Sequence, residues 1–530
     1  MKAVAKIPVK KEHLILASLM LLGIIFVAGN IRLLDFWLDE AAVYIAIKHS
    51  FWELGGITAQ YAQQFLHNFL LKIWTLFFGS GVVALRGFST ACYLLLILTI
   101  YKVGNYLFRN KKIGLLAAFL LTTNYFAIWY AMEVKAYALA ALVGLWSFYF
   151  FLKSAREGGK KNYLGYFVFS ALGFYAHPWV IIIFGSQIVS LLVFRRYAQK
   201  IARLMFVQLL IFLSAIPFFI LTFNQGKLGV NSYAGTVGWE VILQSFGYLT
   251  YGASLAYAIF SVVALFLVIK KRVFLDAILE RLFLGNRAKN GYIRKEPLTA
   301  QQKEELAMNG MLFFYLFFPL VLATAVSHFT PAYVLGRYEM TVLPAFLLIM
   351  ANLWFKIREK SWLVVIGLAL LYAAFSCIIN YRGDIEAYKS TNKTVVRDIY
   401  AKAKSGDYII TTDLSWATVY YYSGFLSNNQ RINLVAYPKQ IERQVVWMNL
   451  PEMNKSENRE KYISEADALV ERIKNDPKAE QIFVFYKTDR PINEILKNKL
   501  DENFKLISNY YPEIPREPDW YDYVLIYKKQ

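Results

Sequence analysis

Two adjacent carboxylates, Asp39 and Glu40, follow the first long apolar run of the chain, which extends from Leu14 to Leu34. Ionisable groups at a membrane edge are costly to keep in apolar surroundings, and for that reason they often mark a functional site. A carboxylate at the mouth of a membrane cavity can serve as a general base or bind an ion. The same pair would also suit a solvated loop after a spanning helix. We treat Asp39 and Glu40 as the candidate catalytic residues.

The composition places this pair in a membrane protein. The chain has 530 residues, of which 57% are hydrophobic and 17% aromatic, and this is too apolar for a soluble enzyme of such length. The two short runs at 162–176 and 178–194 could instead form one broken hairpin. With both included, about eleven runs are long enough to span a bilayer: 14–34, 82–103, 113–131, 136–152, 162–176, 178–194, 204–222, 243–269, 310–327, 339–355 and 361–379.

The net charge of +21 is explained by topology and not by binding to nucleic acid. Alternate loops are rich in Lys and Arg, and the positive-inside rule places these loops in the cytoplasm. They also suit contact with anionic membrane lipids. The N-terminus is then cytoplasmic, and everything after Asn380 lies outside. The opposite loops hold few basic residues: Lys48, Lys72, Lys135, Lys227 and Arg337.

The remaining polar candidates all fall on the predicted outer side of the membrane. Carboxylates, histidines and isolated basic residues on one face favour an extracytoplasmic active site at the bilayer surface. Besides the carboxylate pair, they are His67 in the first outer loop, Glu133 and Lys135 at the tip of the next outer hairpin, His177 in the following outer turn, and His328 and Arg337 before the tenth span.

Five short motifs in order between residues 10 and 355 resemble a known family. They are Leu38-Asp39-Glu40-Ala41, the stretch from His67 to Gly79, Leu85-Arg86, the stretch from Glu133 to Leu139, and Arg337-Tyr338 followed by Leu343-Pro344-Ala345. The pattern is similar to the polytopic glycosyltransferases of the GT-C fold, in the branch of protein O-mannosyltransferases and lipid A aminoarabinose transferases. Asn68 and Phe69 stand where the family has two prolines. Lys135 replaces the usual arginine and lacks its bidentate fork.

The resemblance implies a sugar donor carried on a polyprenyl phosphate. An acceptor hydroxyl would attack the anomeric carbon in line and invert it, and Asp39, or else Glu40, would take the proton. A nearby cation would stabilise the phosphate that leaves. The implied substrate-binding residues are Arg86, Lys135, Arg337, Glu133, His67, Tyr338 and His177.

Plainer explanations exist for several of these residues. Glu133 and Lys135 could pair with each other at a hairpin tip, and Arg86 could be an anchor that extends to the interface. His67 could be an interfacial histidine without a ligand, and His177 could be a plain turn residue. A divalent metal cofactor is a further alternative, with Glu133, His67 and His328 as its candidate ligands. Their spacing matches no compact metal-binding motif, however.

The residues after Asn380 predict a second domain, with a boundary between 1–380 and 381–530. Strands are expected near 407–412, 432–435, 481–486 and 523–527, and helices near 386–404, 463–475 and 491–503. This alternation indicates a small extracytoplasmic α/β domain with a mostly parallel sheet. The polar stretch 436–462 is expected to be a long loop. The domain could recognise the acceptor or could be a structural cap.

We therefore expect an α-helical polytopic membrane protein of the bacterial cytoplasmic membrane. Its predicted activity is inverting transfer of a hexose or pentose to an outer hydroxyl on a glycan, lipid or protein. A surface-polysaccharide polymerase or ligase would use related donors. A lipid or sugar flippase without chemistry is the other alternative. A transporter, however, should place charged groups near helix midpoints, whereas here they gather at one face.

Overall fold

The computed structural model comprises two compact units. The helical unit comprises Met1–Gly29, Arg86–Phe219 and Ala234–Arg382, and the mixed unit comprises Asn30–Leu85, Ile220–Tyr233 and Gly383–Gln530. The structure describes residues 11–60, 64–193, 198–217, 219–220, 238–250, 300–329, 334–356, 392–412, 415–426, 431–442, 455–488, 490–510 and 523–529, with separate positions between 364 and 379.

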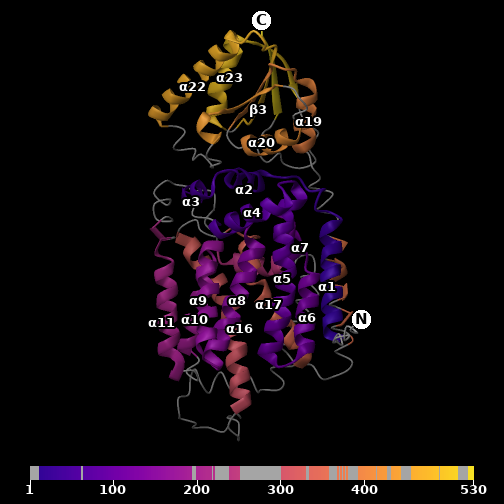
Figure 1. The fold of residues 1–530 in the computed structure, drawn as a ribbon, viewed down its shortest axis with the longest axis vertical. Helices are drawn as coiled ribbons and strands as arrows, with labels where there is room; N and C mark the ends of the chain where they lie inside the picture. Colours follow the sequence, from indigo (N-terminus) through magenta and orange to yellow (C-terminus); the bar gives the residue numbers. More distant parts are fainter. Residues whose placement is uncertain are drawn as a thin grey trace, which may run out of the picture. The chain divides into compact units, whose positions relative to one another are not determined.

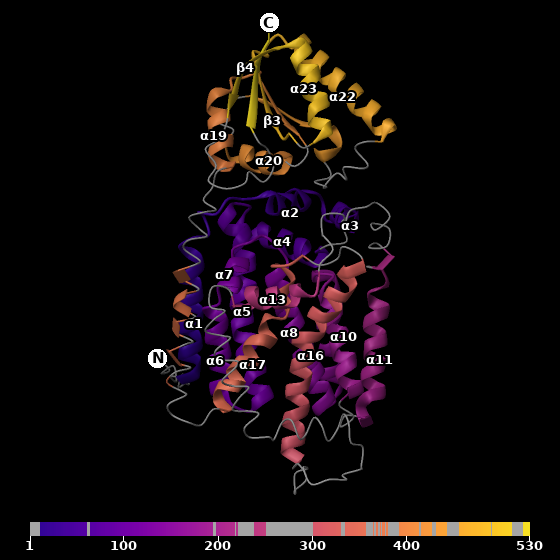
Figure 2. The same ribbon diagram turned by 180° about the vertical axis from the view of Figure 1, so that it is seen from behind.

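The long helices of the helical unit run side by side as a bundle (Figures 1 and 2). In chain order its described elements are α1 Lys11–Ala28, α5 Val82–Phe108, α6 Lys111–Thr122, α7 Tyr125–Ala131, α8 Tyr137–Arg156, α9 Lys160–Ala176, α10 Val180–Val193, α11 Ala198–Ser214, α13 Glu240–Thr250, α16 Ala300–Phe329, the 3-10 helix η2 Tyr338–Thr341, and α17 Leu343–Lys356.

This bundle confirms the predicted fold class of a polytopic helical membrane protein. Among the described residues, 4 helices are long and apolar enough to span a bilayer, namely α1, α5, α8 and the 307–329 part of α16. The pair α6 and α7, bent by 64°, would make a fifth span. Helices α9, α10, α11 and α17 coincide with further predicted runs and have 17, 14, 17 and 14 residues. Most of 243–269 and 361–379 lies outside the described residues.

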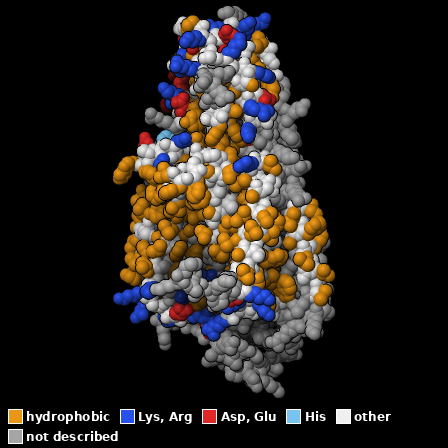
Figure 3. All heavy atoms as spheres, turned by 45° about the vertical axis from the view of Figure 1, so that its right-hand side comes forward, with side chains coloured by type: hydrophobic (Ala, Val, Ile, Leu, Met, Phe, Trp, Pro, Cys, Tyr) orange, Lys and Arg blue, Asp and Glu red, His pale blue; other side chains and the backbone are white. Residues whose placement is uncertain are grey.

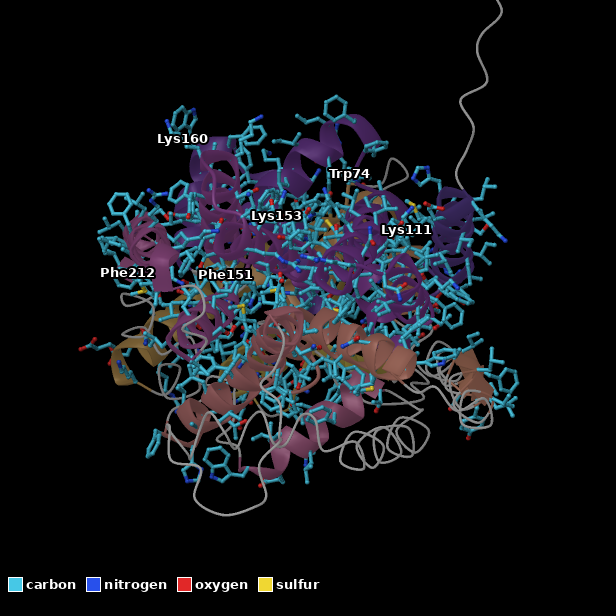
Figure 4. The ribbon with its side chains drawn as sticks, turned by 90° about the horizontal axis from the view of Figure 1, so that it is seen from below. Trp74, Lys111, Phe151, Lys153, Lys160 and Phe212 are labelled. Atoms are coloured by element: carbon cyan, nitrogen blue, oxygen red, sulfur yellow. The ribbon has the colours of Figure 1, made fainter. Side chains whose placement is uncertain are left out.

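Side chains of the helical unit are distributed as a bilayer requires. Hydrophobic groups cover its flank, and Lys and Arg gather at one end of this apolar band (Figure 3). Seen from that end, Lys111, Lys153 and Lys160 are spread over the bundle, with Phe212 at the rim (Figure 4). Phe151 is fully buried inside. This charged end matches the loops that the sequence predicts to be cytoplasmic.

Four neighbouring helices of the bundle share a buried polar network. Ser147 of α8 lies 2.8 Å from Ser170 of α9, and Gln187 of α10 donates to Ser147 at 3.2 Å. The Tyr166 hydroxyl donates to Gln187 at 2.7 Å and accepts from Gln208 of α11 at 3.2 Å. Polar side chains that bond across helices stabilise packing in lipid, where water cannot replace the partner.

The mixed unit combines the first long loop with the C-terminal α/β fold. Its described elements are α2 Leu38–Lys48, α3 Phe51–Gln60, α4 Phe65–Phe78, α19 Asn392–Lys402, β1 Tyr408–Thr412, α20 Ser415–Leu426, β2 Asn433–Tyr437, η3 Lys439–Glu442, α22 Ser456–Asn475, β3 Gln481–Tyr486, α23 Pro491–Asn503, β4 Lys505–Tyr510 and β5 Tyr523–Lys528.

The sheet of the mixed unit has the order β2-β1-β3-β5-β4. Strand β1 is parallel to β2 and β3, whereas β5 is antiparallel to β3 and β4. Helices α22 and α23 lie side by side against one face (Figure 1). Their apolar residues, such as Ile473 and Leu496, bury Ile482 and Val484 of β3. The predicted α/β fold is therefore confirmed, with one antiparallel strand, β5, between β3 and the edge strand β4.

Several predicted boundaries in this fold were wrong. Strand β4 was not predicted because its residues are mostly exposed, which removes the alternating pattern that marks a strand. Helix α20 was missed because its aromatic and β-branched residues are poor helix formers. The expected loop at 436–462 contains η3, and α22 begins within it at Ser456. The expected helix at 386–404 is described from Asn392 to Lys402.

Boundaries in the helical unit also differ from the predicted runs. Helix α1 ends at Ala28, since Gly29 and Asn30 follow and both residue types favour turns. The run predicted at 339–355 begins with the single turn of η2, and a regular helix starts only at Leu343. Pro344 fits the first turn of α17, because no intrahelical donor is required there.

Candidate functional site

The turn between α7 and α8 carries Glu133 and Lys135, and α5 holds it in place. The Ser89 hydroxyl donates to the Glu133 carbonyl at 2.6 Å, and the Thr90 hydroxyl donates to the Ala131 carbonyl at 2.8 Å. Glu133 is 7% exposed, and Lys135 is half-buried. Buried backbone carbonyls need such partners, so these hydroxyls fix the turn and its two charged side chains.

Arg86 lies on the same face of α5 as these two hydroxyls. It precedes Ser89 and Thr90 by three and four residues, a spacing that places side chains on one helix face. Its side chain is 1% exposed. A guanidinium stays charged in a protein and is costly to bury without compensating charge or dipoles. The backbone of the 131–135 turn is bonded to this same face.

Arg337 precedes η2, and the residue before it fixes its position. Gly336 has φ +80°, and its carbonyl accepts a hydrogen bond from the Tyr130 hydroxyl of α7. A Cβ atom at residue 336 would lie 2.8 Å from a ring carbon of Tyr248. Both the backbone angle and this close approach require glycine. The 334–341 segment is therefore locked against α7 and α13.

An aromatic wall extends from this segment to the α9–α10 turn. The Tyr338 ring contacts His177, with 5.1 Å between centroids, and Trp179, with 4.7 Å. His177 in turn lies 5.6 Å from the ring of Tyr137, the first residue of α8. Rings packed in this way bury a large area and resist reorientation. Tyr338 and His177, both predicted binding residues, thus belong to one packed group.

His177 is neutral at physiological pH in this environment. It lies in the turn between α9 and α10, where burial lowers its pKa to about 3, with a smaller contribution from the charge of Lys135. The Trp179 backbone N–H donates to its Nδ1 at 3.2 Å, so the neutral ring carries its proton on Nε2. His177 can therefore accept at one nitrogen and donate at the other, without adding charge.

Glu339 is a buried carboxylate that the sequence reasoning missed. It is 0% exposed and accepts a hydrogen bond from the Ser245 hydroxyl at 3.0 Å. Tyr130 lies close enough to Glu133, Arg337 and Glu339 to interact electrostatically with all of them. A usable signal existed, because the apolar run predicted at 339–355 begins with this acid, and an acid within such a run is a functional candidate.

The helical unit thus brings together most of the predicted binding residues. Ring contacts join Tyr130 to Tyr137 and Tyr137 to His177. Tyr130 interacts electrostatically with Glu133, Arg337 and Glu339, and His177 interacts with Lys135. The group contains two carboxylates, one guanidinium and one ammonium group, together with the aromatic wall. We call this group the polar cluster; its members are Glu133, Lys135, His177, Arg337, Tyr338, Glu339 and Tyr130.

The candidate catalytic pair lies in the mixed unit, in the first turn of α2. Asp39 is half-buried, and Glu40 is 0% exposed. The N-cap residue, Trp37, makes no capping bond with its side chain. Carboxylates in a first turn are stabilised by the helix dipole and by the free N–H groups of that turn. A carboxylate held in this way suits the role of proton acceptor that the sequence predicts.

His67 lies in the first turn of α4 within the mixed unit. It is 0% exposed, and its Nδ1 lies 3.1 Å from Oδ1 of the neighbouring Asn68. Asn68 stands at one of the two positions where the family has proline, so an amide contact orients the ring here. The preceding Gln64 has φ 71°, and this left-handed residue sets the direction in which α4 begins.

No metal centre is found in the part of the chain that the structure describes. Over these residues, no group of three or more His, Cys, Asp or Glu side chains is placed to hold a metal ion. His328 lies near the end of α16, in its last turn. The structure gives no support to a metal role for Glu133, His67 or His328.

The predicted residues are thus divided between the two units. Arg86 and the polar cluster belong to the helical unit, whereas Asp39, Glu40 and His67 belong to the mixed unit. That the two groups face one cavity stays a prediction.

Comparisons with known proteins agree with the motif analysis. The family model described as dolichyl-phosphate-mannose-protein mannosyltransferase matches residues 63–221. A comparison with curated proteins finds no match. Crystal structures of ArnT from Cupriavidus metallidurans, one in the apo state and one bound to undecaprenyl phosphate, are similar over 97% of both chains, each with a TM-score of 0.60 and 12% identity.

The family model supports the motifs within its matched segment, whereas the solved structures support the fold. The matched segment contains the His67, Arg86 and Glu133 motifs, and their predicted resemblance is confirmed there. The solved structures show the fold over nearly the whole chain. The chain is thus a multi-pass membrane protein with the GT-C fold of membrane glycosyltransferases.

Proposed function

We propose that this protein is an inverting glycosyltransferase that moves a sugar from a polyprenyl phosphate to a hydroxyl group outside the cytoplasm. The observation that carries the proposal is the polar cluster. It gathers Glu133, Lys135 and Arg337 in a unit whose fold is shared with ArnT bound to undecaprenyl phosphate. Half-buried cations beside apolar helices suit a lipid phosphate, whose charge must be held at the edge of the hydrocarbon region.

The reaction assigns separate tasks to the two units. The acceptor oxygen attacks the anomeric carbon, and the bond between that carbon and the phosphate oxygen breaks, so that the polyprenyl phosphate leaves with the bonding electrons. Asp39 takes the hydroxyl proton, with Glu40 as the second candidate. Arg337, Lys135 and Arg86 stabilise the charge on the departing phosphate. His177 and Tyr338 are the candidates for contacts with the donor sugar.

The proposed orientation rests on the distribution of basic residues. Lys and Arg gather at one end of the apolar band of the helical unit (Figure 3), which the positive-inside rule places in the cytoplasm. The catalytic residues and the domain after residue 381 then face outward from a bacterial cytoplasmic membrane. The acceptor is a hydroxyl on a glycan, a lipid or a protein, and the donor sugar is a hexose or a pentose.

Donor cleavage is the direct test of this function. The full chain in lipid nanodiscs is given synthetic undecaprenyl-phosphate sugars, each with a hexose or pentose, together with an envelope extract as acceptor. We expect release of undecaprenyl phosphate with one of these donors, accompanied by transfer of radiolabelled sugar to the extract. Movement of an intact donor across a vesicle bilayer, without release, would instead identify a flippase.

Orientation is tested by labelling with a thiol reagent that cannot cross membranes. In a chain with both native cysteines replaced by serine, Ser508→Cys on exposed β4 should react in intact spheroplasts, whereas Asn110→Cys before α6 should react only after lysis. The reverse pattern would place the C-terminal domain in the cytoplasm.

A further inference from the structure

The segment just before α2 is hydrogen-bonded to the C-terminal α/β fold within the mixed unit. The Tyr422 hydroxyl of α20 accepts from the Phe36 backbone N–H at 2.9 Å and donates to Oδ1 of Asp35 at 2.8 Å. Oδ2 of Asp35 accepts from the backbone N–H of Asn392, the first residue of α19, at 2.9 Å. One carboxylate and one phenol therefore join three segments of the chain.

Aromatic packing strengthens the same junction. Phe36 is fully buried and stacks on Tyr421 with 3.9 Å between ring centroids. The Tyr421 ring also meets Tyr44 of α2 edge-on at 4.9 Å. Tyr44 follows Glu40 by four residues, which places both on one face of α2. The face that carries Glu40 is therefore the face turned toward α20.

The other end of α2 is held by a different part of the mixed unit. The Lys72 ammonium of α4 donates to the Ile47 carbonyl in the last turn of α2 at 2.8 Å. The same ammonium lies 5.0 Å from the centre of the Phe51 ring. The last turn of α2 thus has a local anchor, whereas its first turn, with Asp39 and Glu40, depends on α19 and α20.

We propose that Tyr422 and Asp35 are positioning residues, through which the C-terminal domain sets the first turn of α2 and so aims the catalytic carboxylates. This inference rests on the proposed function and assigns the domain a role in the chemical step, beyond recognition of the acceptor. Tyr422 bonds to the residue that lies three positions before Asp39. A small rotation there would displace the base, and reaction rates fall steeply with such displacement.

The critical variant is Tyr422→Phe, which keeps the ring but removes the hydroxyl. Tyr420→Phe is a matched control on the same helix, since Tyr420 is 37% exposed and lies outside the junction. Amide hydrogen exchange of the 35–44 peptide in nanodiscs reports opening of this segment. We expect about tenfold faster exchange in Tyr422→Phe, as the loss of hydrogen bonds from a buried junction would give, and no change in Tyr420→Phe.

The kinetic readout separates positioning from general stability. Using the undecaprenyl-phosphate sugar that wild-type protein cleaves, we expect Tyr422→Phe to lower kcat about tenfold with KM for that donor unchanged and an unaltered unfolding temperature. Asp35→Asn should behave similarly. The double variant should be no worse than the stronger single one, because the two side chains act as one unit.

Two results would overturn the inference. Unchanged exchange in 35–44 would show that the α/β fold does not hold this turn, and faster exchange with unchanged kcat would show that its position does not matter for the reaction. Failure of the proposed function looks different. In that case wild-type protein cleaves no donor, or Asp39→Asn and Glu40→Gln both retain full activity, while the exchange measurement still reports on the junction by itself.

Discussion

The polar cluster of the helical unit and the carboxylate pair of the mixed unit are held in place in different ways. In the cluster, the α7–α8 turn is fixed by Ser89 and Thr90, and Arg337 by the glycine that precedes it. These contacts belong to the bundle that carries the cluster. The first turn of α2, by contrast, bonds to Tyr422, which lies 386 positions after Phe36 in the chain.

This difference suggests a division of labour between the two units. A phosphate-binding group benefits from a rigid surrounding, because preorganised charges stabilise a leaving group without reorganisation during the reaction. The base is positioned instead by a junction with a distant segment of the chain, so its aim depends on Tyr422 and Asp35. Substitutions in the cluster should therefore slow cleavage of the donor or lower the free energy of unfolding. The carboxylate pair should respond with a loss of rate.

The largest effect is expected from removal of the base. Asp39→Asn keeps the shape of the side chain but cannot take a proton at neutral pH, so donor cleavage should fall by about 10²–10⁴-fold. The unfolding temperature should stay close to that of wild type. Near-native turnover in Asp39→Asn, with a comparable loss in Glu40→Gln, would assign the role to Glu40.

The next effect concerns the cation of the cluster. Arg337→Ala should lower kcat by about 10²–10³-fold, the usual cost of losing one group that stabilises developing charge. Arg337→Lys should recover part of this loss, because the charge remains but the bidentate fork does not. Arg109→Ala is the control, since Arg109 is largely exposed at the basic end. Equal losses of kcat in Arg337→Ala and Arg109→Ala would show that Arg337 has no special role in stabilising the phosphate.

A smaller effect is expected where the cluster is locked. Gly336→Ala places a Cβ atom 2.8 Å from the Tyr248 ring at a residue with φ +80°. It should lower the free energy of unfolding by about 1–2 kcal/mol for the backbone angle alone. The matched control is Gly247→Ala in α13, where a Cβ would meet nothing within 4 Å. That change should be neutral or stabilising, because alanine favours a helix. Equal unfolding temperatures for both variants would contradict the locked segment.

The fold was largely predictable because the bilayer imposes strong constraints. A spanning helix must satisfy its own backbone in about 20 apolar residues, so runs such as those of α1, α5 and α8 stand out in the sequence. Strands β1 and β3 stood out for a similar reason, since both are buried on two faces. Exposed β4 and aromatic α20 lacked such signals, and tertiary packing decided their structure.

Candidate site residues were recognisable in the sequence only where a charged residue interrupts an apolar context. Glu133, Lys135 and Arg337 met that condition, and the structure places them in one cluster. Glu339 met it as well but was counted as part of a span. Asp35 and Tyr422 could not be paired from sequence, because neither residue type is unusual in its segment, and only the folded chain brings them within 2.8 Å.

The smallest expected effect comes from His177 and tests how rigidly the cluster is buried. Burial lowers the folded-state pKa of His177 to about 3, below the value near 6.5 expected in the unfolded chain. A depressed pKa means that the unfolded state binds the proton more readily. The associated stability is therefore fully present above pH 6.5 and is lost progressively as the pH falls from 6.5 toward 3.

Unfolding temperatures at pH 7.5 and 5.5 measure this contribution in nanodiscs. Wild type should lose about 1 kcal/mol of unfolding free energy over this interval through His177. His177→Phe keeps a ring beside Tyr338 and cannot titrate, so its pH-dependent loss should be smaller by that amount, even if its stability at pH 7.5 is lower. Identical pH dependence in the two proteins would show that His177 is hydrated in the folded state. The aromatic wall would then be open to water, and the cluster would lack the rigid surroundings that set it apart from the first turn of α2.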